Sequence, residues 1–176
     1  MVVDIVLIGP PGSGKTSVAK ALARKLNTSR IDTDHEIEVK AGKKISEIFT
    51  EDGEAKFREM EVEVVAEALA HDGGIVSVGG GSVLNESSQR AIATAQQVVF
   101  LDVSISNAAP RVGFNKDRPL LALNPRQQWL QLMEKRRPIY ESLATLTIST
   151  DNKKPDEVAS EIIETMSRAK QKNGGQ

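Results

Sequence analysis

The sequence predicts an α/β fold of three layers, with a five-stranded parallel sheet between two layers of helices. Short apolar runs alternate with longer segments of helical periodicity along the chain, which is the order found in parallel sheets. The runs are rich in Val, Ile and Leu, as expected of strands that are buried on both faces. A chain of 176 residues, 39% of them hydrophobic, can bury one substantial core, so we expect a single domain over residues 1–176.

The first half of the chain is expected to contain three strands. Its elements are a strand at 4–8, a helix at 15–26, a short strand at 29–32, helical segments from about 34 to 70, and a strand at 74–78. Apolar residues recur at helical spacing within the long helical region, but Gly42 and Gly53 interrupt it.

The second half is expected to contain the other two strands. Its elements are a helix at about 86–94, a strand at 98–103, a polar stretch at 113–125, a helix at 126–141, a strand at 143–149, a helix at 155–170 and a fraying tail at 171–176. Pro155 suits the first turn of the last helix, where its missing N–H costs nothing. Trp129 and Phe100 are expected to be core residues.

The balance of charge argues against a general nucleic-acid surface. The chain has 23 basic and 24 acidic residues and a net charge of -1, whereas phosphate-neutralising proteins usually have a basic surplus. It has no cysteine, which excludes disulfides and thiolate metal sites. No signal peptide is recognisable, and no stretch approaches the roughly 20 apolar residues that span a bilayer. We expect a soluble, cytoplasmic monomer that binds neither nucleic acid nor membrane.

The strongest motif joins the first strand to the first helix. Residues 9–16 read GPPGSGKT and fit the phosphate-binding pattern G-x-x-x-x-G-K-[ST]. Glycines let backbone N–H groups surround phosphate oxygens, and the following helix adds its positive N-terminal end. Lys15 is expected to reach the β- and γ-phosphates of ATP, and the Thr16 hydroxyl to bind Mg²⁺. The motif predicts a P-loop NTPase fold and nucleotide binding, but it does not identify the reaction.

An acidic pair is expected at the carboxyl end of the second strand, where α/β proteins bind ligands. Asp32-Thr33-Asp34 ends this strand, so the two-residue period points both carboxylates the same way. One carboxylate could support the magnesium shell while the other contacts an acceptor hydroxyl. The alternative is that Asp34 is only the N-cap of the next helix.

Three glycines close the third strand. Gly79, Gly80 and Gly81 would let a small molecule lie against bare backbone and use its N–H groups. The alternative is a plain flexible turn.

Two arginines are candidates for binding a carboxylate, because a guanidinium group can donate two parallel hydrogen bonds to it. These are Arg58 and Arg136. Alternatively, Arg58 forms a solvated ion pair with Glu54 or Glu61 on its own helix, and Arg136 is an ordinary charge near a helix C-terminus.

A basic segment over residues about 112–124 is a candidate lid. Arg111 and Arg118 flank residues 112–117, and such a segment could close over the nucleotide, exclude water and place positive charge on the transferring phosphoryl group. The alternative is a surface loop with incidental charges.

Together these elements resemble the shikimate kinase family over nearly the whole chain. The resemblance rests on GPPGSGKT at 9–16, DTD at 32–34, FR at 57–58, GGG at 79–81, RPLL at 118–121 and KRRPIY at 135–140. Many NTPases share the first segment, whereas the ordered set of the other five is specific to this family. The resemblance implies a nucleoside-monophosphate-kinase-like fold. It also implies transfer of the ATP γ-phosphate to the 3-hydroxyl of shikimate, in chorismate and aromatic amino acid biosynthesis.

The resemblance further implies a role for each matching residue. The implied catalytic residues are Lys15, Asp34 and Arg118, with Asp34 as the base or the orienting group. The implied nucleotide contacts are Gly12, Ser13, Gly14, Lys15, Thr16, Ser17, Arg111, Arg118 and Pro155, with Thr16 and Asp32 serving Mg²⁺. The implied shikimate contacts are Asp34, Arg58, Gly79, Gly80, Gly81 and Arg136, partly within a substrate-binding region at about 34–62. The family's arginine lies two residues before the proline, which selects Arg136 over Arg137.

Two other readings are open. One is a related small kinase of gluconate or of a nucleoside monophosphate, against which the GGG and RPLL segments and the carboxylate-binding arginines argue. The other is a P-loop module that uses nucleotide as a switch, against which intact Lys15, Thr16, Asp32 and Asp34 argue.

Overall fold

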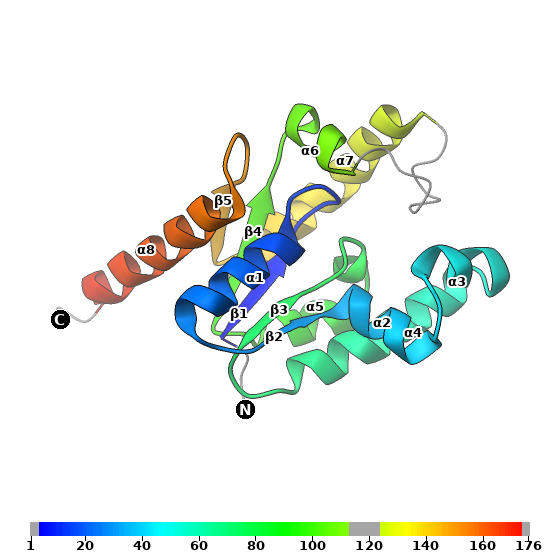
Figure 1. Ribbon diagram of the computed structural model, residues 1–176, viewed down its shortest axis with the longest axis horizontal. Helices are drawn as coiled ribbons and strands as arrows, with labels where there is room; N and C mark the ends of the chain where they lie inside the picture. The colour runs from blue at the N-terminus through cyan, green and yellow to red at the C-terminus, as the bar shows by residue number, and fades with distance from the viewer. Residues whose placement is uncertain (1–3, 113–123, 174–176) are drawn as a thin grey trace.

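The computed structural model describes residues 4–112 and 124–173 (Figure 1). Its elements in chain order are β1 (Ile5–Ile8), α1 (Lys15–Leu26), β2 (Arg30–Asp32), α2 (Thr33–Ala41), α3 (Ile45–Glu51), α4 (Glu54–Leu69), β3 (Ile75–Ser77), the short 3₁₀ helix η1 (Ser82–Leu84), α5 (Glu86–Ile92), β4 (Gln97–Asp102), α6 (Ile105–Val112), α7 (Pro125–Leu143), β5 (Leu146–Ser149) and α8 (Pro155–Asn173).

The five strands form one parallel sheet in the order β2-β3-β1-β4-β5. In this register, Ile5 of β1 lies opposite both Ile75 of β3 and Gln97 of β4. All carboxyl ends therefore meet at one edge, and the loop after the central strand β1 lies between those after β3 and β4. This arrangement confirms the predicted fold class and places the candidate residues at one edge of the sheet.

Helices cover both faces of the sheet, because successive strand residues point to opposite faces. Val6 and Ile8 of β1 belong to the core that packs against α4, α5, α6 and α7. Ile5 and Leu7 belong to the core under α1 and α8, which lie together on the other face (Figure 1). Among the described residues, no helix is both long and apolar enough to cross a membrane.

Helices α2 and α3 form a group with the first half of α4 at the side of the sheet, while the second half of α4 packs on the sheet itself (Figure 1). Their shared apolar cluster contains Ile37, Ile48 and Phe57. Gly42 and Gly53 separate the three helices, with φ angles of 69° and 87° that favour glycine. The interruptions predicted from these two glycines are therefore confirmed.

Some predicted boundaries are wrong near the C-terminus. Residue 143 was expected to begin the last strand, but α7 continues through Leu143, which packs on the core together with Tyr140 at helical spacing. Strand β5 begins only at Leu146. Helix α8 runs to Asn173, so residues 171–173 are helical and not frayed.

Candidate active site

The turn between β1 and α1 depends on glycine. Gly12 and Gly14 have φ angles of 83° and 86°, in the left-handed region that other residues avoid. A Cβ on Gly12 would lie 2.8 Å from the carbonyl oxygen of Ala108, so the turn packs closely against α6. Lys15 donates from Nζ to the Gly9 carbonyl at 2.8 Å. Its ammonium group is thus held at the turn, where the N-terminal end of α1 also favours anions.

One carboxylate joins this turn to the end of β2. Asp32 Oδ2 accepts a hydrogen bond from Thr16 Oγ1 at 2.6 Å, and its Oδ1 accepts from the backbone N–H of Asp34 at 3.1 Å. Asp32 is therefore the N-cap of α2, and the alternative that Asp34 caps this helix is wrong. Since α2 begins at Thr33, Asp34 lies in a helical turn. Its direction does not follow from the strand period that we assumed.

A cavity of about 360 Å³ extends from the phosphate-binding turn. It is lined by every described residue predicted to contact the nucleotide, namely Gly12, Ser13, Gly14, Lys15, Thr16, Ser17, Arg111 and Pro155. Arg111 donates to the Thr150 carbonyl at 2.7 Å and to the Thr150 hydroxyl at 2.9 Å, which ties α6 to the loop after β5. Arg118 and most of the predicted lid lie outside the described residues.

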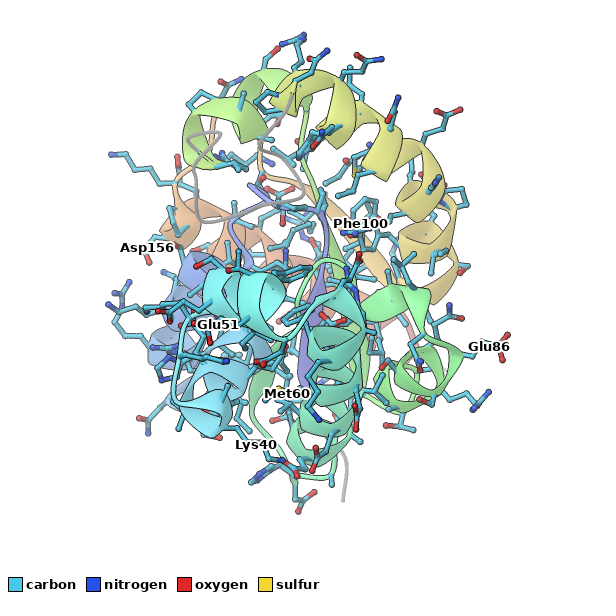
Figure 2. All side chains as sticks on the ribbon, turned by 90° about the vertical axis from the view of Figure 1, so that its right-hand side faces the viewer. Lys40, Glu51, Met60, Glu86, Phe100 and Asp156 are labelled. Carbon is cyan, nitrogen blue, oxygen red and sulfur yellow. The ribbon has the colours of Figure 1, made fainter. Side chains whose placement is uncertain are left out.

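A second cavity of about 500 Å³ lies on the side of α2, α3 and α4, which Figure 2 turns toward the viewer. It is lined by all the residues predicted to contact the acceptor: Asp34, Arg58, Gly79, Gly80, Gly81 and Arg136. Phe49, Phe57 and Leu132 add apolar surface. Its size is typical of small-molecule sites, and it combines an apolar wall with a few charged groups.

Each of the three glycines at 79–81 lies against at least one charged side chain of this cavity. A Cβ on the first would lie 2.6 Å from Asp34 Oδ1, and one on the second 3.4 Å from an Arg136 nitrogen. A Cβ on the third would lie 2.9 Å from Arg58 Cζ. The turn is therefore closely packed, which argues against the alternative of a plain flexible turn.

A buried carboxylate holds Arg58 at the cavity. Arg58 donates to Glu61 Oε1 at 2.8 Å, and the Glu61 side chain is only 4% exposed. A second, longer contact of 3.6 Å reaches the more exposed Glu54. The main ion pair is thus not the solvated surface pair of the alternative reading. A guanidinium group has five N–H donors, so donors remain for the carboxylate of a ligand.

Arg136 and Arg137 have different surroundings. Arg136 is 8% exposed and lines the acceptor cavity. It lies well before the end of α7 at Leu143, so the alternative of a C-terminal helix charge is wrong. Arg137 donates to both carboxylate oxygens of Asp102, at 3.0 and 2.9 Å, and this hydrogen bonding raises the pKa of Arg137. Arg137 thus joins α7 to β4 and leaves the cavity to its neighbour.

The two cavities meet at four shared residues: Thr16, Asp32, Asp34 and Gly80. A nucleotide in the smaller cavity would have its phosphates at the turn with Lys15, and an acceptor in the larger one would lie beside Asp34. The arrangement permits direct transfer of a phosphoryl group between two bound molecules, which depends chiefly on positioning and charge.

Three buried side chains that the sequence did not identify hold the backbone of the site. Trp129 donates from Nε1 to the Pro11 carbonyl at 2.9 Å, so it is a core residue, as expected, with an additional contact to the phosphate-binding turn. Tyr140 donates to the Gly80 carbonyl at 2.6 Å, and Thr33 Oγ1 accepts from the amide of the preceding glycine at 3.1 Å. The sequence offers only two signals for these contacts: Thr33 lies between two acidic residues, and Tyr140 ends the segment KRRPIY.

A P-loop at the centre of a parallel sheet, beside a cavity with carboxylates and guanidinium groups, defines a P-loop kinase of small molecules. The family model for shikimate kinase matches residues 11–167. This chain belongs to the shikimate kinase family.

Individual relatives agree with this assignment. The chain is 52% identical to the shikimate kinase of Thermobifida fusca over 164 residues, which cover 93% of this chain and 95% of the relative. Among solved structures, the shikimate kinase of Acinetobacter baumannii in complex with shikimate superposes with a TM-score of 0.92 at 33% identity, covering 97% of this chain and 95% of the other. A gluconokinase of Sinorhizobium meliloti, at 22% identity and a TM-score of 0.59, covers 94% and 92% and shares the fold alone.

Proposed function

We propose that this chain is a shikimate kinase, which transfers the γ-phosphoryl group of ATP to the 3-hydroxyl of shikimate and releases shikimate 3-phosphate and ADP. The observation that carries the proposal is that the phosphate-binding cavity and the acceptor cavity share Thr16, Asp32, Asp34 and Gly80. The two substrates would meet there without a large rearrangement of the described residues. The product would serve chorismate and aromatic amino acid biosynthesis.

On the nucleotide side, the protein binds charge mainly with its backbone. The amides of the turn around Gly12 and Gly14 surround the phosphates, and Lys15 contacts the β- and γ-phosphates. Arg111 and Pro155 contact the base from opposite sides of the cavity. These roles follow from the family resemblance and from the lining of the cavity.

On the acceptor side, Arg58 and Arg136 hold the carboxylate of shikimate, and the backbone of residues 79–81 forms the adjoining wall. Asp34 then accepts a hydrogen bond from the reacting hydroxyl, orients its oxygen toward the phosphates and takes its proton. Phosphoryl transfer has a loose transition state, so correct placement supplies much of the rate enhancement.

The donors at the junction fit a magnesium ion. Thr16 supplies a hydroxyl and Asp32 a carboxylate, and Mg²⁺ typically takes one or two carboxylates together with phosphate oxygens and water. When bound, Mg²⁺ neutralises the charge that develops on the phosphate oxygens. Residues 4–112 and 124–173 contain no cluster of three or more acidic or histidine side chains suited to a metal. In this proposal the phosphate oxygens of the nucleotide and water would complete the coordination of the ion.

We also propose a single-domain, cytoplasmic monomer that binds no nucleic acid, with a lid over residues 112–124. The near-neutral net charge of -1 supports the absence of nucleic-acid binding. In this proposal Arg118 belongs to the lid and places its guanidinium group on the transferring phosphoryl group, while the lid excludes water from the site.

Release of ADP, measured with shikimate, quinate, gluconate and AMP as alternative acceptors, tests the function. We expect rapid release with shikimate and little with the other three. Release without any acceptor would indicate an ATPase, and faster release with gluconate or AMP would replace the assignment. Binding of ATP without any acceptor-dependent release would favour a nucleotide-dependent switch.

A further inference from the structure

The glycine turn at residues 79–81 has three consecutive peptide groups held by hydrogen bonds. The Gly79 N–H donates to Thr33 Oγ1 at 3.1 Å, and the Gly79 carbonyl accepts from the Ser82 N–H at 3.0 Å. The Gly80 carbonyl accepts from the Tyr140 hydroxyl at 2.6 Å. Glycine has more backbone freedom than any other residue, so a turn of three glycines keeps one shape only if its surroundings impose it.

Tyr140 reaches the turn from inside the core. It is fully buried, and its ring stacks on Phe100 of β4 with 5.1 Å between the ring centroids. Burial raises the pKa of Tyr140 to about 12, and the positive charge of Arg136 offsets part of this rise. The hydroxyl therefore stays protonated and able to donate at neutral pH. Arg136 lies four residues earlier on α7, so one helix face carries both the cavity arginine and the side chain that holds Gly80.

Thr33 reaches the turn from the opposite side. It is fully buried and lies between Asp32, which caps α2, and Asp34, which lines both cavities. Its hydrogen bond thus sets the distance between the acidic pair and the first glycine. Neither Thr33 nor Tyr140 is among the residues that line the two cavities, and both contact the turn directly. Tyr140 also interacts with Arg136, so the state of the turn itself has to be measured to show that an effect on the acceptor passes through it.

We propose that Tyr140 and Thr33 are positioning residues for the acceptor, which hold the glycine turn in the one shape that fits the acceptor cavity. The turn in turn limits where Asp34, Arg58 and Arg136 can lie, because each of its glycines packs against one of these side chains. The inference rests on the proposed function for the identity of the acceptor, but not for the positioning itself.

Replacement of one hydroxyl tests the proposal. Tyr140→Phe removes the donor to Gly80 and keeps the ring, and we expect the KM for shikimate to rise about tenfold while the KM for ATP stays within about twofold. Ser142→Ala is the matched control. Like Tyr140, Ser142 lies on α7 and donates from its hydroxyl to a backbone carbonyl, but it is exposed and its partner is Ile139 of the same helix, at 2.9 Å. It should leave both KM values unchanged.

A second measurement does not depend on activity. In ¹⁵N NMR spectra of the protein without ligand, Tyr140→Phe should shift or broaden the amide signals of residues 79–81, and Ser142→Ala should not. Unchanged glycine signals would overturn the proposal, because a raised KM for shikimate would then arise through the contact of Tyr140 with Arg136 and not through the turn. If the wild-type protein releases no ADP with shikimate, the proposed function fails, and the glycine signals still decide whether Tyr140 positions the turn.

A second pair of variants covers the possibility that Tyr140→Phe does not fold. Thr33→Val removes the acceptor of the Gly79 N–H with little change in volume, whereas Thr33→Ser keeps the oxygen. We expect Val, but not Ser, to raise the KM for shikimate severalfold and to move the glycine signals. Equal behaviour of the two variants would contradict the proposal.

Discussion

The two cavities that meet at Asp34 are built in different ways. Six of the eight described residues predicted for the nucleotide lie within residues 12–17, one turn and the start of one helix. The acceptor cavity takes most of its charged groups from α2, α4 and α7, and it is also lined by the glycine turn after β3. The phosphate-binding part of the nucleotide cavity is thus continuous in the chain, whereas the acceptor cavity exists only after the helices have packed on the sheet.

The difference extends to how each region is held. At the phosphate-binding turn, positive φ angles at Gly12 and Gly14 shape the backbone. At the acceptor cavity, side-chain contacts hold individual groups: Glu61, three residues further along α4, holds Arg58, and Tyr140 of α7 holds Gly80. We therefore expect substitutions in the first region to act through the backbone, and those in the second to act through lost contacts or steric displacement of one side chain.

The largest effect is expected at the junction. Asp34→Asn keeps the size of the side chain and removes its negative charge, so the reacting hydroxyl loses its proton acceptor. We expect kcat to fall by about 10²- to 10⁴-fold while ATP still binds. Coupled ADP release and a nucleotide titration measure the two quantities. Asp4→Asn, at the opposite edge of the sheet, is the matched control, and wild-type turnover by Asp34→Asn would remove this residue from the mechanism.

The next largest effect is expected from an arginine of the acceptor cavity, compared with an arginine outside the cavity. Arg58→Lys replaces a two-pronged donor by a point charge, and we expect the KM for shikimate to rise about tenfold or more with little change in the KM for ATP. The matched control is Arg137→Lys, which breaks the bidentate contact with Asp102 outside the cavity. It should lower the Tm and leave both KM values unchanged. An unaltered KM in Arg58→Lys would place Arg58 outside the binding site.

A pair of glycine variants compares the two regions directly. Gly81 has a φ of -91°, which alanine adopts without strain, but a Cβ there would lie 2.9 Å from Arg58 Cζ and displace the guanidinium group. We expect Gly81→Ala to raise the KM for shikimate by about threefold to tenfold. Gly14 has a φ of 86°, and a Cβ there would have no protein atom within 4 Å, so within the protein Gly14→Ala acts through backbone strain of about 1–2 kcal/mol. We expect Gly14→Ala to raise the KM for ATP.

If both variants raise the KM for the same substrate, the two regions are not separate. A rise in both KM values for Gly14→Ala alone would instead show that the phosphate-binding turn also shapes the acceptor cavity. Steady-state kinetics with each substrate varied at saturating levels of the other distinguish these outcomes.

The contrast between a local turn and a cavity built from distant segments also decides how much of this site the sequence predicts. The fold and the phosphate-binding turn follow from local patterns, because strand periodicity and glycine spacing act over a few residues. The residues that hold the glycine turn are distant from it in the chain: Tyr140 and Gly80 are 60 positions apart, and Thr33 and Gly79 are 46 positions apart. No local pattern carries such a pairing.

Two pairs of nearby residues show that a shift of one or two positions in the chain limits what the sequence can predict. In the structure Asp32, and not Asp34, is the N-cap of α2, because the residue at which a helix begins decides which side chain caps it. Likewise, periodicity alone does not separate Arg136 from Arg137, because about 100° of helix rotation sends one to the cavity and the other to Asp102. The family motif made that distinction, and packing explains it.

The smallest effect on activity is expected from the titration of Tyr140, because its hydroxyl keeps its proton at neutral pH. This residue is the only tyrosine of the chain, so the near-ultraviolet absorbance of tyrosinate reports on it alone. Burial raises the pKa of Tyr140 to about 12, above its ordinary value of 10.0. Because the folded state holds this proton more tightly than the unfolded state, its contribution to the free energy of unfolding is fully present below pH 10 and is lost as the pH rises toward 12. A midpoint near 10 in the folded protein would show that the hydroxyl is open to water, and the hydrogen bond to Gly80 could not then hold the acceptor side as described.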